Sequence, residues 1–201
     1  QIHIAAYLIL IAALFDFFDG FAARMLHAKS ELGKMLDSLA DIVSFGVLPA
    51  ILFYQMLIMS LTIQDATFNI ETADLFESVI IYTAFLIAVF AAIRLAKFSI
   101  DNVQEDSFIG LPVPAVALFT SGYFLSVYYT SVQPLRVTLL QPEIVLPVVV
   151  FLSILMVSKI NMFSLKFSNF SWKQNQTRYL FLLAVIMGIA IFKYYALPAA
   201  I

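Results

Sequence analysis

Four aspartates lie close together in a chain that is otherwise strongly apolar. Asp16 and Asp19 are three residues apart and Asp37 and Asp41 are four apart, so each pair shares one face of a helix. Carboxylates that share a site repel one another unless some are protonated or a cation lies between them. Because the ligands are oxygen atoms only, the fitting cations are Mg²⁺, Mn²⁺ or Ca²⁺. Paired divalent ions serve phosphoryl transfer, so we interpret the aspartates as metal ligands for phosphate chemistry.

Small residues and an arginine accompany the aspartates. Gly20 and Ala23 keep the surface of the first helix low beside the carboxylates, and Gly33 lies one turn before Asp37 on the second. Arg24 offers a fork of donors that suits phosphate oxygens. The simpler alternative, solvated charges at helix ends paired with nearby cations, accounts for any one aspartate better than for all four together. We therefore predict a site that binds phosphate groups.

The composition is that of a membrane protein. Of the 201 residues, 63% are hydrophobic and 12% are charged, and the mean hydropathy is +0.98. An ordinary soluble domain carries about 25% charged residues, and a spanning helix needs about 20 mainly apolar ones. The stretches near this length are residues 2–18, 36–61, 75–97, 112–130, 142–159 and 178–198. We predict an all-α, polytopic membrane helix bundle with about six transmembrane helices, forming a single domain over residues 1–201.

The few charges indicate topology rather than a nucleic-acid partner. The formal net charge is −2, whereas a nucleic-acid-binding face would be basic. If the six helices alternate, the loops on the side of the aspartates carry most of the cations: Arg24, Lys29, Lys34, Arg94, Lys97, Lys159, Lys166, Lys173 and Arg178. The opposite loops carry Arg136 and Lys193. This asymmetry places the aspartates at the cytoplasmic face of a multi-pass protein of the cell membrane.

The aspartate pattern resembles the signature of a known family. Read as D-x-x-D-G-x-x-A-R-x8-G-x-x-x-D-x-x-x-D over residues 16–41, it is similar at every fixed position to the CDP-alcohol phosphotransferases. Within that family, four later segments resemble the bacterial phosphatidylserine synthases: LDSLADIVSFGVLPA (36–50), RLAKF (94–98), FIGLPVPA (108–115) and MVSKI (156–160). Family members commonly have another membrane helix before the one with the first two aspartates, so we expect one upstream in the natural chain.

The resemblance implies an activity and a division of labour. The family joins CDP-diacylglycerol to an alcohol and releases CMP, and here L-serine would be the acceptor. Asp16, Asp19, Asp37 and Asp41 would hold two divalent ions, with Asp41 also the presumed general base. The CDP-lipid would be bound by Gly20, Ala23, Arg24 and Gly33. The family likeness also implies a homodimer in a lipid membrane.

The carboxylate of L-serine calls for a cation near the aspartates. Arg94 closes an apolar stretch and its donors suit a carboxylate, and Lys97 follows three residues later, so we predict that both bind the acceptor. The segment GLPVP at 110–114 is expected to be a rigid helix start lining the site, because proline lacks an amide donor. His3 and His27 have no partners at metal-ligand spacing and are expected to be structural.

Two other functions stay open at this stage. The first keeps the family and changes the acceptor to glycerol phosphate or inositol phosphate, whose phosphate groups would call for more cations than this chain offers near the site. The second is a cation transporter, which predicts acidic residues spread through the depth of the bilayer. The aspartates instead gather at one edge.

Overall fold

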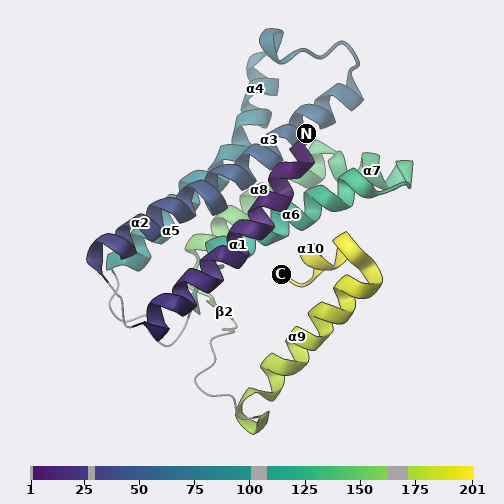
Figure 1. The fold of residues 1–201 in the computed structure, drawn as a ribbon. Helices are drawn as coiled ribbons and strands as arrows, with labels where there is room; N and C mark the ends of the chain where they lie inside the picture. The colour runs from purple at the N-terminus through teal and green to yellow at the C-terminus, as the bar shows by residue number, and fades with distance from the viewer. Residues whose placement is uncertain (1, 27–29, 101–107, 163–171) are drawn as a thin grey trace.

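Helices make up nearly all of the structure, a computed structural model that describes residues 2–26, 30–100, 108–162 and 172–201 (Figure 1). The α-helices are α1 (Ile2–Met25), α2 (Glu31–Asp41), α3 (Leu48–Gln64), α4 (Leu75–Tyr82), α5 (Leu86–Ile100), α6 (Val113–Tyr129), α7 (Gln133–Leu140), α8 (Pro142–Val157), α9 (Trp172–Phe192) and α10 (Ala196–Ala199). A π-helix, η1 (Ile42–Val47), joins α2 to α3, and 3₁₀ turns occur at η2 (Ile70–Thr72), η3 (Thr83–Phe85) and η4 (Lys193–Tyr195). Two short strands, β1 (Phe108–Ile109) and β2 (Asn161–Met162), pair antiparallel.

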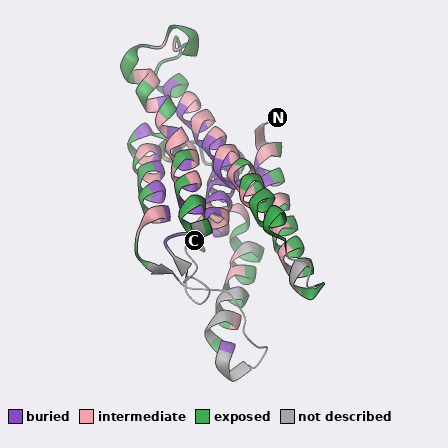
Figure 2. Ribbon diagram, turned by 90° about the vertical axis from the view of Figure 1, so that its left-hand side faces the viewer, coloured by how far each residue is buried: buried purple, intermediate pink, exposed green. Residues whose placement is uncertain are grey.

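The bundle is built around α3, α5, α6 and α8. Their buried faces form one apolar core, to which α1 contributes Ala6 and Ile9. The largest fully buried side chains include Phe45 in η1 and Phe53 in α3. Buried residues gather where these helices lie side by side, whereas α2 has none (Figure 2). The predicted all-α class is confirmed.

Each predicted apolar stretch lies over helical segments, but fewer described helices are long enough to span. Three qualify by length and composition: Ile2–Gly20, Glu31–Gln64 and Leu75–Ser99. The pair α7 and α8, bent by 52°, would be a fourth if it forms one span. Helix α6 has 17 residues, which at about 1.5 Å per residue falls short of a hydrocarbon core of about 30 Å. The chain is a helical membrane protein whose later spans are bent or short.

Most of the acidic residues between the end of α3 and the start of α4 form local hydrogen bonds. Asp65 accepts hydrogen bonds from the hydroxyl and the amide of Thr67, at 2.7 and 2.8 Å, and these bonds hold the pKa of Asp65 below its usual value. Asp74 and Glu77 form a reciprocal capping box at the start of α4. These carboxylates thus have local structural roles.

The other end of the bundle is tied together at Gly110. Its amide donates to the carbonyl of Ile160 at 2.9 Å beside the β1–β2 pair. The φ of Gly110 is +76°, and an added Cβ would lie 2.5 Å from the carbonyl oxygen of Met156, so a side chain there is excluded. Pro112 then caps α6, which begins at Val113. The predicted helix start at 110–114 is confirmed.

The C-terminal helices reach the bundle through α10, which packs on α6 at Gly122 (Figure 1). A Cβ on Gly122 would collide with Leu197 and Pro198. Nearby, the hydroxyl of Tyr7 lies 3.2 Å from that of Tyr129 and 3.3 Å from that of Tyr194. Close approach at a glycine is how membrane helices associate, because lipid removes the hydrophobic drive between them.

We expect Gly122→Ala to destabilise the fold, because the added methyl has no room against α10. Overpacking of this kind costs about 1–3 kcal/mol in free energy of unfolding. The matched control is Gly188→Ala, whose methyl would meet Ala196 at an ordinary 3.4 Å. Thermal unfolding in detergent checks both. A melting temperature for Gly122→Ala equal to that of the parent would contradict the packing described for α10.

Candidate metal and phosphate site

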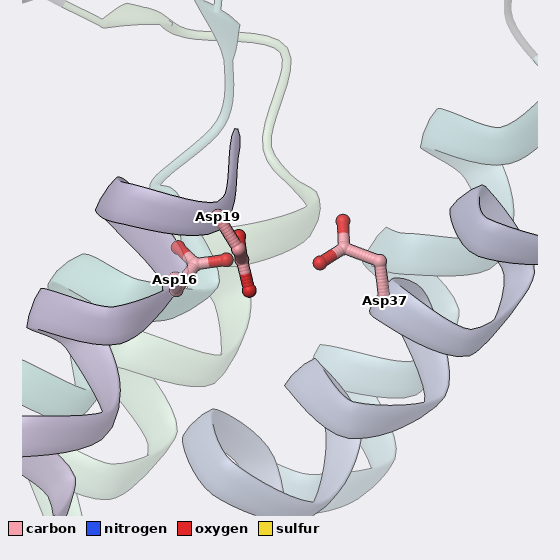
Figure 3. A group of neighbouring side chains, drawn as sticks. All are labelled: Asp16, Asp19 and Asp37. Carbon is pink, nitrogen blue, oxygen red and sulfur yellow. The ribbon is translucent and has the colours of Figure 1, made fainter. Parts of the chain in front are cut away.

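Three carboxylates from two helices converge on one place. Asp16 and Asp19 on α1 point toward Asp37 on α2 across the space between the helices (Figure 3). One oxygen atom from each residue lies within 4.8 Å of those from the other two. Asp16 is half-buried, and Asp19 and Asp37 are exposed. The three form an open, oxygen-only group that a hard metal ion could occupy.

The local sequence explains why the carboxylates meet. The i, i+3 spacing puts Asp16 and Asp19 on one face of α1. The start of helix α2 is well defined, because Ser30 caps it and accepts a hydrogen bond from the amide of Gly33 at 3.0 Å. Asp37 therefore lies nearly two turns into a helix whose start is fixed. Three like charges at this separation require a compensating cation or protonation.

Asp41 lies one turn further along α2, outside the group of three. It is the residue from which η1 begins, and it is half-buried. Its carboxylate is within electrostatic range of Asp16, Asp19 and Asp37, and also of Arg94 on α5. Asp41 thus differs from its three neighbours in that it interacts both with their carboxylates and with a cation.

Arg94 is the buried cation of the site. Its side chain is only 8% exposed, and its Nε atom has no hydrogen-bond partner among the described residues. Leaving a buried donor unsatisfied is costly, so such atoms in native structures call for an explanation. A bound anion beside Asp41 would provide one. Lys97, one turn later on α5, is exposed.

The remaining predicted residues fall in different surroundings. Gly20 is half-buried next to Asp19, while Ala23 and Arg24 belong to α1 but their side chains lie outside the described residues. Gly33 is exposed one turn before Asp37, and an added Cβ there would lie 2.9 Å from the Ser30 hydroxyl oxygen. The need for a tight cap is thus one local reason for this glycine.

His3 does not belong to the site. His3 lies near the other end of α1, where its ring stacks on Tyr128 with centroids 4.8 Å apart. This agrees with the structural role expected of it. His27 lies outside the described residues.

The π-helix after Asp41 was not anticipated from the sequence. In η1 the amide of Leu48 donates to the carbonyl of Val43, five residues earlier, instead of the usual four. An apolar run such as IVSFGV carries no signal that separates the two patterns. Its one visible cue is Gly46 in the middle of the run, because glycine within a helix is disfavoured unless close packing requires it.

Comparison with known proteins identifies the class of protein to which this site belongs. Residues 1–155 match the family model for CDP-alcohol phosphatidyltransferase, so the chain belongs to that family. It is 36% identical over 114 residues to CDP-diacylglycerol–serine O-phosphatidyltransferase of Bacillus subtilis, covering 57% of this chain and 56% of the relative.

Two archaeal relatives give a similar picture. The protein of the same name in Methanocaldococcus jannaschii is 38% identical over 116 residues, covering 58% of this chain and 48% of the relative. The archaetidylserine synthase of Methanothermobacter thermautotrophicus is 33% identical over 131 residues, covering 63% and 48%. The chain spans about half the length of these curated relatives. No solved structure matches it.

We expect the isolated protein in detergent to bind Mn²⁺ through this site, and Asp37→Asn to weaken that binding at least about tenfold. The substitution keeps the shape of the side chain and removes a charged ligand from the group of three. Glu143→Gln, at an exposed acidic residue at the start of α8, is the matched control. Titration followed by Mn²⁺ electron paramagnetic resonance measures both. Equal affinity in the Asp37→Asn variant and the parent would rule out a metal at these carboxylates.

Proposed function

We propose that this protein transfers the phosphatidyl group of CDP-diacylglycerol to L-serine, giving phosphatidylserine and CMP. The observation that carries the proposal is the meeting of three carboxylates from α1 and α2 in one open site of a membrane protein of this family. The names of the relatives support serine as the acceptor, since most act on CDP-diacylglycerol and serine by name. Phosphatidylserine synthesis is thus the activity that accounts for both the site and the likeness.

The donor set fits divalent metal ions. Asp16, Asp19 and Asp37 offer oxygen atoms within 4.8 Å of one another, and we propose that Asp41 completes the ligands for two ions, Mg²⁺ or Mn²⁺, with Ca²⁺ also possible. When bound, such ions would neutralise the diphosphate of the lipid and the charge developed on the transferred phosphoryl group. The openness of the site leaves room for that diphosphate.

In this proposal other residues of the signature bind the CDP-lipid. Gly20 and Gly33 leave low helix surfaces on α1 and α2, and Ala23 with Arg24 continues the same helix beyond Asp19. Arg24 would pair with phosphate oxygens. These assignments rest on the positions of the residues in the family signature.

Asp41 is the proposed general base. The serine hydroxyl oxygen attacks the β-phosphorus of CDP-diacylglycerol, a new phosphorus–oxygen bond forms, and the bond to the CMP oxygen breaks. The hydroxyl proton passes to Asp41, and CMP leaves with the electron pair. Asp41 suits this role because it is not one of the group of three, is half-buried, and lies within electrostatic range of Arg94.

Arg94 is the proposed partner of the serine carboxylate. It is buried, its Nε lacks a partner among the described residues, and Asp41 is within electrostatic range. A guanidinium binds a carboxylate through two parallel hydrogen bonds, which would hold the serine hydroxyl near the base. Lys97 is the second residue proposed for the acceptor, and its exposure suits a role in attracting the acceptor from water.

The setting of the site suits a lipid substrate. Exposed apolar side chains flank the aspartates on both helices, among them Phe15, Phe18, Leu36 and Leu39. Acyl chains can lie along such surfaces while the headgroup meets the carboxylates at the membrane edge. We propose that this edge is the cytoplasmic face of the cell membrane, as the distribution of cations indicates. Homodimerisation stays a prediction from family likeness.

The alternatives are weaker on the same observations. A phosphorylated acceptor, glycerol phosphate or inositol phosphate, would need several cations, and Arg94 is the only one of the described lysines and arginines that is buried. A cation transporter would need carboxylates through the bilayer, whereas the described residues hold a single three-carboxylate group, at one edge.

We expect purified protein to release CMP from CDP-diacylglycerol with L-serine, in a reaction that needs a divalent metal and no ion gradient. Release is measured with L-serine, glycerol phosphate and inositol phosphate as separate acceptors. Asp37→Asn should nearly abolish the release. CMP release with glycerol phosphate and none with serine would overturn the choice of acceptor. Metal transport without CMP release would overturn the enzyme.

We expect Arg94→Gln to raise the KM for L-serine on the order of tenfold or more, because a charged partner of the carboxylate is lost. Arg94→Lys should recover part of the affinity, since it restores the charge without the planar fork. The KM for CDP-diacylglycerol should change much less in both. Steady-state kinetics with each substrate varied in turn measures the difference. Equal increases in both KM values would show that Arg94 does not act on the acceptor.

A further inference from the structure

Helix α5 and the π-helix η1 make an unusually close contact one turn away from Asp41 and Arg94. Gly46 in η1 is buried, and an added Cβ there would lie 3.2 Å from the Cβ of Ala91 and 3.7 Å from the Cα of Ala88. The first distance is tighter than ordinary van der Waals contact, so a side chain at this position requires a shift of a few tenths of an ångström between the two helices. Ala91 is itself fully buried.

The contact lies beside the proposed acceptor site on both helices. Asp41 comes five residues before Gly46, and Arg94 comes three residues after Ala91. The α2–η1–α3 helix and the following α5 run in opposite directions (Figure 1). Asp41 and Arg94 therefore both lie about one turn from the contact, toward the same end of the bundle. Arg94 is about 4.5 Å further along its axis than Ala91.

We propose that Gly46 is a positioning residue for the acceptor: its contact with Ala88 and Ala91 sets the separation between Asp41 and Arg94. The inference rests on the proposed function, in which Asp41 receives the hydroxyl proton and Arg94 holds the carboxylate. The hydroxyl and the carboxylate belong to one small acceptor, so the separation between Asp41 and Arg94 must match the distance between these two groups. Gly46 is buried against α5 and acts through the spacing of the two helices.

Two further observations agree with this role. The π-helix is confined to the residues between Asp41 and α3, where Phe45 and Gly46 are both buried, so the irregular turn is held against the core. Such π-helical turns are frequent at functional sites. In addition, the Nε atom of Arg94 has no hydrogen-bond partner among the described residues although the side chain is buried. The helix spacing brings Arg94 within electrostatic range of Asp41 and leaves Nε free for a ligand.

The first test is a graded series at Gly46. Gly46→Ala and Gly46→Val add one and three carbon atoms to the contact. We expect the KM for L-serine to rise on the order of tenfold for Gly46→Ala, and further for Gly46→Val, because small misplacements of reacting groups are costly. The KM for CDP-diacylglycerol and the affinity for Mn²⁺ should stay within about twofold to threefold. Both depend on α1 and α2 rather than on α5.

The second test moves a methyl group across the interface. Ala91→Gly removes the Cβ that a side chain at position 46 would meet. The double variant Gly46→Ala with Ala91→Gly should restore the KM for L-serine to within about twofold of the parent. Gly188→Ala is the matched control, because its methyl meets Ala196 at an ordinary distance of 3.4 Å far along the chain. It should leave all kinetic constants unchanged.

A merely structural role for Gly46 predicts a different result. Poor packing would lower the melting temperature and the active fraction, and the rate would fall with both KM values unchanged. If Gly46→Val fails to fold, Ala91→Val places the same wedge from α5 and should give the same acceptor-specific increase. An unchanged KM for L-serine in Gly46→Ala, or no recovery in the double variant, overturns the inference.

These outcomes are separate from a failure of the proposed function. If the parent protein releases no CMP with L-serine, the choice of substrate is wrong. The Gly46 series is then run with whichever acceptor supports release. If no acceptor does, the proposed function and this inference both fall. If the parent uses serine normally and the series shows no acceptor effect, only the role of Gly46 is wrong.

Discussion

The repulsion among like-charged carboxylates is the constraint on which the site depends. Asp16, Asp19 and Asp37 come from two helices and offer oxygen atoms within 4.8 Å of one another at the edge of a membrane protein. Most of the residues around them are apolar, and carboxylates are costly at membrane depth. The arrangement is understandable if the ligands that the site binds are also the groups that compensate its negative charge. Divalent ions and the diphosphate of a CDP-lipid together have the required charges.

The rest of the fold holds the helices at fixed distances from one another, in a lipid environment where the hydrophobic effect contributes little to their association. In lipid, apolar side chains gain little by meeting one another, so close approach at small residues and satisfied backbone groups take over. Gly46 against α5, Gly122 against α10 and Gly110 against the end of α8 are three such points. Each lies where two segments meet that are distant in the sequence. Three of the glycines in this chain therefore mark tertiary contacts between helices or segments.

The aspartate site and the helical class could be predicted from the sequence, because charged residues and prolines are rare in this apolar chain and their positions are therefore informative. Four aspartates at helical spacing in an apolar chain predict a shared site, and the family signature adds the chemistry. The helical class and the start of α6 at Val113 follow from the length of the apolar stretches and from Pro112. These features depend on the spacing of residues along the chain and on backbone chemistry, and both can be read from the amino-acid sequence.

Other features depend on how helices meet, which local patterns do not record. A run of apolar residues reads the same whether the helix is long, bent or short, so the bend between α7 and α8 was not foreseen. The π-helical turn after Asp41 changes the hydrogen-bond partner by one residue without any change in composition. The burial of Arg94, within electrostatic range of Asp41, follows from the packing of α5 against the core.

The exposure of α2 has a consequence for how the protein responds to its ligands. This helix carries Asp37 and has no buried residue, so it is attached to the core mainly through its continuation into η1 and α3. A helix that is anchored only at its C-terminal end can be displaced at its N-terminal end. A metal ion bound by Asp37 together with Asp16 and Asp19 would then hold the free end of α2 against α1. Because a ligand that binds the folded state stabilises it, a ligand that holds α2 in place also raises the resistance of α2 to local unfolding and to proteolysis.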